Sequence, residues 1–278
     1  MGRFRALRAT AVLTLVLAVP LGGAYLIGRP LLPHASPPDH TPSATASPVP
    51  AGVLMTTGSA HVALTFNDGP DPTWTPLVLK TLRQYHVKAT FCLLGRNAEA
   101  YPELVRTIVA DGHTLCNHTW NEDLDLGSRP RQDIESNLLR TSQAIHAAAP
   151  QAPIPYFRQP GGNWTPQLVA VAESLGMTGL HWAVDPRDWE EPPAAAIVAT
   201  VSHRTGPDSI VLLHDGGGDR LNTATALATL LPDLLSRFQL EALPIDPPET
   251  GQTRAPSAPP QQVGQPQDTA AGPGTGSR

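Results

Sequence analysis

The chain has 278 residues, with 19 Lys and Arg against 24 Asp and Glu, and its formal net charge is -5. This length is typical of one domain of about 100–200 residues with flanking segments, and the acidic balance argues against a nucleic-acid partner, because no basic patch could hold a phosphate backbone. Only 15% of the residues are charged, which excludes a chain kept disordered by its own charge.

The first segment has the layout of an export signal. Arg3, Arg5 and Arg8 precede the uncharged, mostly apolar run 9–28, which has small residues near its end. A run of this length could also span a bilayer uncleaved, since about 20 residues suffice. We therefore expect residues 1–28 to be a signal peptide or an N-terminal membrane anchor. The protein would then be secreted, or anchored on the outer face of the cytoplasmic membrane.

Proline marks the limits of the folded domain. Of the 31 prolines, 15 lie in the stretches 29–58 and 244–278, which are otherwise rich in Ser, Thr, Ala, Gly and Gln. Such segments contain little that could form a core and are typical of extended linkers and disordered tails. We predict a Pro-rich linker over 29–58, a folded domain over 59–243 and a disordered tail over 244–278.

Strand-like and helix-like segments alternate along the domain. In chain order we expect strands over 61–66, 88–94, 113–117, 156–157, 179–184 and 209–213, and helices over 74–86, 102–111, 131–148, 166–175, 194–203 and 223–238. The buried face of the third helix is expected to carry four apolar residues, Ile134, Leu138, Leu139 and Ile145. This alternation indicates an α/β fold with a parallel sheet under helices, either an open doubly wound sheet or a barrel.

Polar residues follow nearly every predicted strand. They are Asn67 and Asp68, His118 and Glu122, Arg158 to Trp164, Asp185 to Trp189, and His214 with Asp215. Both candidate architectures place their chemistry at the carboxyl ends of the strands. Five such groups at one edge of the sheet therefore predict a functional site.

Five motifs at this edge occur in a recognisable order. They read T-F-N-D-G-P at 65–70, H-T-W-N-E at 118–122, R-Q-P-G-G at 158–162, D-P-R-D-W at 185–189 and L-L-H at 212–214. The set resembles the polysaccharide deacetylase family, also called carbohydrate esterase family 4. The resemblance implies a distorted, incomplete (β/α) barrel of about seven parallel strands. It also implies a monomeric hydrolase that removes N-acetyl groups from N-acetylglucosamine-type sugars of a cell-wall or related polysaccharide.

The resemblance also implies a divalent metal, and zinc is the metal we expect. Asp68 and His118 match two of the family's three ligands, and Glu122 stands where the family has a second His. Glutamate can bind zinc, so Glu122 is the predicted third ligand. A weak or empty metal site with a solvated Glu122 remains the alternative.

The family's general base is replaced in this chain. The first motif normally begins with two Asp residues, and here the first is Asn67, a neutral amide that cannot accept a proton at useful pH. One negative charge is thus lost at position 67 and one is gained at Glu122, which leaves the charge of the site unchanged. Arg158, which in the family pairs with that base, is expected to lose its partner and to find another anion. The alternative function is an impaired relative that binds glycans without hydrolysing them.

The remaining motif residues have roles in proton donation and substrate binding by resemblance. His214 matches the general acid, and Asp185 matches the carboxylate that orients it, with Trp189 packed alongside. Gly161 stands where the family usually has Tyr, and its backbone N–H would still help to hold the oxyanion. Gly161 and Trp189 are therefore predicted to contact the substrate.

Two cysteines, Cys92 and Cys116, each lie in a strand-like segment. Two cysteines are too few for a disulfide scaffold or for a Cys-only zinc site. In an exported protein they could form a single disulfide, and two buried thiols are the alternative.

Overall fold

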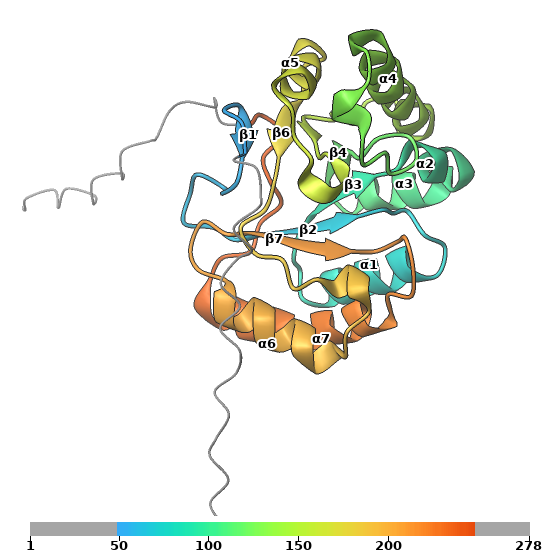
Figure 1. Cartoon of the computed structure of the whole chain (residues 1–278). Helices are drawn as coiled ribbons and strands as arrows, with labels where there is room; N and C mark the ends of the chain where they lie inside the picture. Colours follow the sequence, from blue (N-terminus) through green and yellow to red (C-terminus); the bar gives the residue numbers. More distant parts are fainter. Residues whose placement is uncertain (1–48, 248–278) are drawn as a thin grey trace, which may run out of the picture. The chain divides into compact units, whose positions relative to one another are not determined.

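The structure is a computed structural model that describes residues 49–247 (Figure 1). The predicted signal or anchor over 1–28 lies outside the described residues, as do most of the linker and of the tail. None of the helices in the described part of the chain is both long enough and apolar enough to cross a membrane.

A single sheet of seven parallel strands forms the centre of the domain. The strands are β1 Val53–Leu54, β2 Ala63–Asn67, β3 Thr90–Leu93, β4 Thr114–Asn117, β5 Tyr156–Phe157, β6 Thr178–Leu180 and β7 Ile210–His214, in the spatial order β1-β6-β5-β4-β3-β2-β7. Every residue of β2 and of β7 is buried. This burial agrees with the mainly apolar residues of both strands, as expected for strands covered on both faces.

The sheet curls but does not close. No ladder joins its edge strands β1 and β7; instead single bridges pair Thr56 with Ser209 and Val184 with Val211 across the gap. The structure thus confirms the predicted incomplete (β/α) barrel, and excludes the open doubly wound sheet as the alternative.

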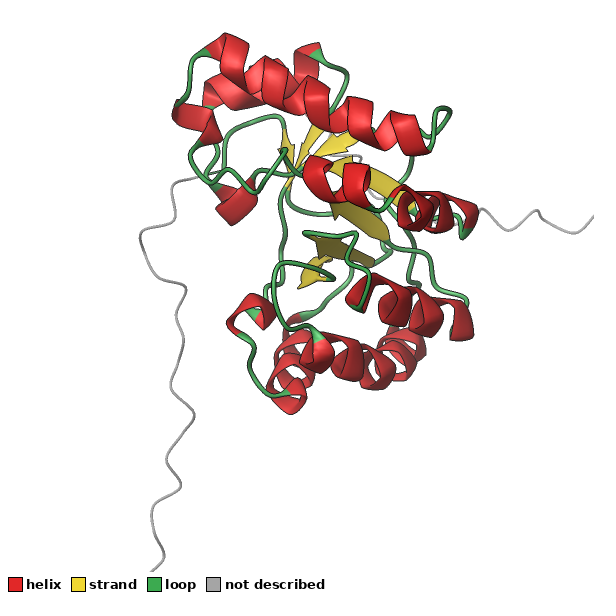
Figure 2. Ribbon diagram, turned by 90° about the vertical axis from the view of Figure 1, so that its right-hand side faces the viewer, coloured by secondary structure: helices red, strands yellow, loops and turns green. Residues whose placement is uncertain are grey.

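Helices cover the outside of the curled sheet. They are α1 Trp74–Gln84, α2 Gly95–Ala100, α3 Pro102–Ala110, α4 Arg131–Ala148, α5 Pro166–Ser174, α6 Ala194–Arg204 and α7 Leu221–Arg237, with short 3-10 turns η1 Leu126–Ser128, η2 Pro160–Gly162 and η3 Asp188–Glu190. Figure 2 shows the strands between two groups of helices. The main core lies between sheet and helices, where Phe66 and Phe91 stack with ring centroids 5.2 Å apart. All the predicted helices and strands are present, with small shifts at their ends.

The structure differs from the expected one in three details. Val53–Leu54, which we assigned to the linker, form β1 and pair with Gly179 and Leu180 of β6. Helix α2 was not predicted. On α4 the exposed fraction of Leu139 is 40%, and Thr141 takes its place on the buried face, because the buried positions follow the three- and four-residue spacing from Ile134.

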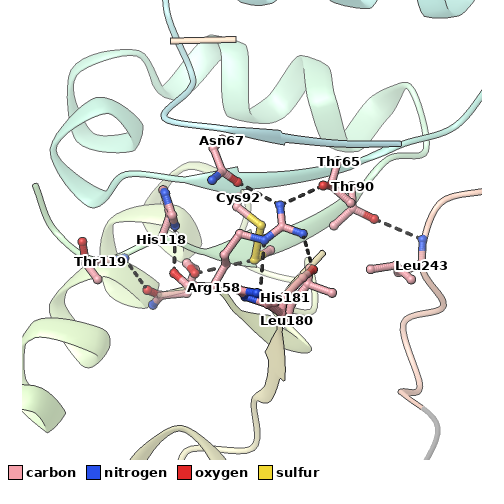
Figure 3. The surroundings of a disulfide bond; sticks show 12 residues. Thr65, Asn67, Thr90, Cys92, His118, Thr119, Arg158, Leu180, His181 and Leu243 are labelled. Carbon is pink, nitrogen blue, oxygen red and sulfur yellow. Dashed lines mark hydrogen bonds between the residues drawn. A yellow bond between two sulfur atoms is a disulfide. The ribbon is translucent and has the colours of Figure 1, made fainter. Parts of the chain in front are cut away.

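A disulfide joins the central strands β3 and β4. Cys92 and Cys116 are register partners on these parallel strands, with Cα atoms 4.2 Å apart, and their sulfur atoms are bonded. Of the two alternatives that the sequence left open, the structure therefore supports the disulfide and not two buried thiols. Figure 3 shows the disulfide together with the residues around it, among them Asn67 and His118.

Removal of this disulfide should destabilise the domain. The two cysteines are 24 residues apart in the chain. In the chain-entropy picture, a cross-link of this span lowers the conformational entropy of the unfolded chain and so adds about 3 kcal/mol to the free energy of unfolding. We expect the Cys92→Ala, Cys116→Ala double variant to lose about that much free energy of unfolding in urea. Two titratable thiols in the denatured wild type, without reductant, would contradict the assignment.

Candidate functional site

The loops that follow the strands meet at the carboxyl-terminal rim of the sheet. Five residues other than glycine have positive φ in these loops, namely Asp68, Thr119, Glu122, Arg187 and Glu191. Such backbone conformations are unfavourable and cluster at functional sites. The rim, where the sequence motifs converge, is therefore also where the backbone is strained.

Asp68 and His118 face each other at the centre of the rim. Both are buried, and Asp68 Oδ1 lies 3.2 Å from His118 Nε2. The Nδ1 atom of His118 lies 2.8 Å from the carbonyl oxygen of Arg158, which requires the ring proton on Nδ1 and leaves the Nε2 lone pair free. Asp68 Oδ1 is buried without a hydrogen-bond partner. Two lone-pair-bearing atoms held together in this way fit a divalent cation between them.

The charge of Asp68 is maintained although the residue is buried. Burial opposes its ionisation, but in the metal-free protein the protonated form of His118, together with His214 and Arg220, holds its pKa below the usual value. The side chain is therefore an anion at neutral pH, as a metal ligand must be.

The structure does not place Glu122 as a third ligand. Among residues 49–247 there is no group of three His, Cys, Asp or Glu side chains arranged to hold a metal, and the side chain of Glu122 is exposed. Glu122 nevertheless feels the charge of the Asp68–His118 pair. Partial burial raises the pKa of Glu122, and the negative charge of Asp68 raises it further. Ligation by Glu122 stays a prediction.

Asn67 keeps Arg158 as its partner, contrary to our expectation. Arg158 Nη1 donates to Asn67 Oδ1 at 2.9 Å and to Thr65 Oγ1 at 2.8 Å. Figure 3 shows the amide nitrogen of Asn67 directed toward His118. Position 67 therefore offers a donor at the metal pair, where a base would offer an acceptor.

Arg158 is fully buried without a counterion. Its other donors reach the carbonyl oxygens of Leu180 at 3.3 Å and of His181 at 3.0 Å. The predicted replacement anion is absent among the described residues, because every acceptor is neutral. Burial of the unpaired charge lowers the pKa of Arg158 to about 9.

The carboxylate that holds His214 is Asp188, and the prediction of Asp185 is wrong. His214 Nδ1 lies 2.7 Å from Asp188 Oδ1, and the His214 backbone N–H donates to Asp188 Oδ2 at 2.9 Å. Burial lowers the pKa of His214, but the hydrogen bond and charge of Asp188 outweigh it and raise the pKa above its usual value. We call these two residues the acid pair.

Asp185 serves the turn that carries Asp188. Its Oδ1 accepts the backbone N–H of Arg187 at 2.7 Å, which closes the turn just before η3. Burial raises the pKa of Asp185. The sequence could have indicated Asp188, since both carboxylates belong to the D-P-R-D-W motif, but the spacing alone did not choose between them.

The two predicted substrate contacts lie on the surface of the rim. Gly161 is exposed and has a φ of 63°, and the space a Cβ there would need is bounded by Leu124 Cδ2 at 3.1 Å. Trp189 is 44% exposed, with the Arg187 guanidinium 4.6 Å from its ring centroid. Both positions are accessible to a ligand.

Three buried residues of the rim make contacts that the sequence did not indicate. Asp215 packs under the Asp68 loop; burial raises its pKa to about 7 although Thr75 donates a hydrogen bond to it. Thr223 and Arg220, from the start of α7, reach Asp188. The run of three glycines at 216–218 is the one local feature of the sequence that indicates close packing near Arg220.

A hollow of about 440 Å³ lies elsewhere, at the amino-terminal end of β4. It is lined by His113, Thr114 and Leu115 and by mainly apolar residues of the neighbouring loops. None of the predicted site residues borders it. The charged and proton-transferring groups of the described residues are concentrated at the rim, so we place the site there.

Known proteins resemble this chain in sequence and in fold. The family model for polysaccharide deacetylase matches residues 55–180. A chitooligosaccharide deacetylase of Sinorhizobium fredii is 40% identical over 199 residues, which are 68% of this chain and 92% of the relative. The solved structure of a peptidoglycan N-acetylglucosamine deacetylase superposes with a TM-score of 0.66 at 31% identity, over 70% of this chain and 92% of that one.

A pseudoenzyme is also among the similar solved structures. It is a member of carbohydrate esterase family 4 from Bacillus anthracis, with a TM-score of 0.62 and 26% identity, over 66% of this chain and 64% of that one. A mutant of the same pseudoenzyme is described as having restored enzymatic activity.

Proposed function

Because the chain belongs to the polysaccharide deacetylase family, a family of hydrolases that act on non-peptide carbon–nitrogen bonds, we propose that it is an exported, metal-dependent deacetylase. Its substrate would be an N-acetylglucosamine-type sugar of a cell-wall or related polysaccharide, as the names of its relatives suggest. The observation that carries the proposal is the pairing of Asp68 and His118 at the same rim as the acid pair.

The residues of the rim divide the proposed reaction among them. A divalent ion held by Asp68 and His118 would polarise the acetamide oxygen and acidify a water molecule. Gly161 would offer its backbone N–H to the oxygen on which negative charge develops. His214, whose pKa is raised by the hydrogen bond and charge of Asp188, would deliver its proton to the leaving amine.

The step that this chain handles poorly is the removal of a proton from the attacking water. Asn67 occupies the position of the family's base, and its carbonyl oxygen is already used by Arg158. This supports a second candidate function, a glycan-binding protein with little or no turnover. The likeness to a pseudoenzyme of the same family supports that reading too.

One experiment separates the two functions. Acetate release from an N-acetylglucosamine oligomer is measured with the zinc-loaded protein, and binding of the same oligomer is measured by calorimetry. Acetate above the buffer control supports the deacetylase. Binding without acetate, with metal present, supports the glycan-binding protein, and neither binding nor acetate contradicts both.

Metal binding should depend on the Asp68–His118 pair. We expect Asp68→Ala and His118→Ala each to weaken zinc binding by more than about 100-fold, and Glu122→Ala to weaken it less, because Glu122 is exposed. Calorimetric titration of the metal-free protein measures this. His61→Ala is the control, since His61 pairs with Glu241 on the surface, and equal affinity in all four variants would contradict the proposed site.

Export and the monomeric state are further parts of the proposal. The support for export is the basic and apolar segment 1–28. Detection of the protein in the medium would indicate a cleaved signal, and detection in the membrane fraction would indicate an anchor.

A further inference from the structure

Arg220 brings a buried positive charge next to the acid pair. The residue precedes α7, and its exposed fraction is 3%. Its Nε donates to the carbonyl oxygen of Gly216 at 2.8 Å, and its Nη1 donates to the carbonyl oxygen of Asp188 at 3.1 Å. The guanidinium thus connects the loop after β7 to η3, the turn that carries the carboxylate of the pair.

The glycines before Arg220 make this connection possible. A Cβ at Gly216 would overlap the carbonyl of Asp68, and a Cβ at Gly217 would lie 2.5 Å from Asp68 Oδ2. At Gly218 a Cβ would lie 2.9 Å from Arg220 Nη2. The segment 216–218 therefore fills the space between Asp68 and Arg220, and the Arg220–Gly216 bond holds it there.

No ion pair accounts for the burial of Arg220. Within residues 49–247 it forms no salt bridge, although other arginines of the chain do. Burying a guanidinium is costly unless its donors are used, and its rigid planar fork holds acceptors from two segments in one fixed geometry, which the flexible ammonium side chain of lysine does not. We therefore attribute the burial of Arg220 to its role in holding two segments together, the loop after β7 and the turn η3.

We propose that Arg220 is a positioning residue that holds Asp188 against His214. Thr223 assists from the first turn of α7, where its hydroxyl donates to Asp188 Oδ2 at 2.9 Å. Asp188 Oδ1 is then left for the His214 ring, which it meets at 2.7 Å. An effect of Arg220 on catalysis is expected only if the proposed function is correct. Its effect on the position of Asp188 is expected in either case.

The test reads the acid pair directly. A proton in a short bond between imidazole and carboxylate gives a far-downfield NMR signal, and this signal can be assigned by its loss in His214→Phe. We expect Arg220→Lys and Arg220→Gln to broaden the signal or shift it upfield. In an active protein both variants should also lower kcat by about tenfold or more, with KM unchanged, because donation of the proton affects the chemical step.

Arg237→Gln is the matched control. Arg237 lies at the other end of α7, where it pairs with Asp233 and also donates to the backbone carbonyls of Ser202 and Thr205 at the end of α6. It should cost stability without moving the signal. If the Arg220 variants do not fold, Thr223→Val removes a single bond to Asp188 and should shift the same signal.

The NMR signal tests the role of Arg220 even if the protein has no deacetylase activity. An inactive wild type that shows the signal, and loses it in the Arg220 variants, supports the positioning role without turnover. A signal and kcat unchanged in Arg220→Lys and Arg220→Gln would overturn it. In the case of misfolded Arg220 variants, an unchanged signal in Thr223→Val would do the same.

Discussion

Replacing Asn67 by Asp is expected to raise the rate of acetate release by about 10²–10⁴-fold, the usual contribution of a general base. The new carboxylate would lie beside Arg158, whose Nη1 is 2.9 Å from Asn67 Oδ1 and which has no counterion. The guanidinium would keep the new carboxylate ionised, so that it could accept a proton near neutrality. The measurement is acetate release from an N-acetylglucosamine oligomer by the zinc-loaded variant.

The effect of this change depends on Glu122. Asn67→Asp adds a negative charge near Asp68 and Glu122, and Asp68 already raises the pKa of Glu122. Replacing Glu122 by His as well restores the net charge of the family site and supplies a second imidazole. We expect the double variant to exceed either single variant, and the two effects to be coupled, since neighbouring sites are not additive. Undetectable activity in the wild type and in all three variants, with metal bound, would favour the glycan-binding function.

Replacing Asp188 by Asn should lower kcat by about 10²–10⁴-fold, because His214 would lose both its orientation and the charge that keeps it protonated. Asp185→Asn is the matched control from the same motif. Its carboxylate accepts a backbone N–H within the turn, so we expect an effect of less than about tenfold. The reverse order of the two variants would restore the original assignment of Asp185 and contradict the structure.

The pH dependence of stability should report the same pair. The pKa of His214 is raised in the folded protein, so the folded state binds its proton more tightly than the unfolded state does. The stabilisation is therefore fully present below the ordinary histidine value of about 6.5 and is lost as pH rises through the folded pKa. In Asp188→Asn this loss between neutral and alkaline pH should be much smaller in urea unfolding curves.

Much of the site could be predicted from the sequence because its parts are local. A polar residue that ends an apolar strand of a parallel sheet must lie at the carboxyl-terminal rim, so the positions of Asp68, His118 and His214 follow from strand periodicity and motif order. The helices were predicted well for the same reason, since a three- and four-residue spacing of apolar residues is a local pattern. The placement of Cys92 and Cys116 on neighbouring strands also followed, whereas the bond between them is shown only by the structure.

What the tertiary structure decided is which groups meet across long separations in the chain. Asp185 and Asp188 are the same residue type in the same motif, so the sequence does not distinguish them. Asp188 is the partner of His214 because Thr223 and Arg220, at the start of α7, hold it there. Arg158 keeps Asn67 because β2 and the loop after β5 approach at one rim, whatever charge position 67 carries. Likewise β1 is too short to be recognised, and it exists only because β6 offers it an edge. Periodicity and motifs specify each element and its end, whereas hydrogen bonds between distant segments exist only once the whole chain has packed.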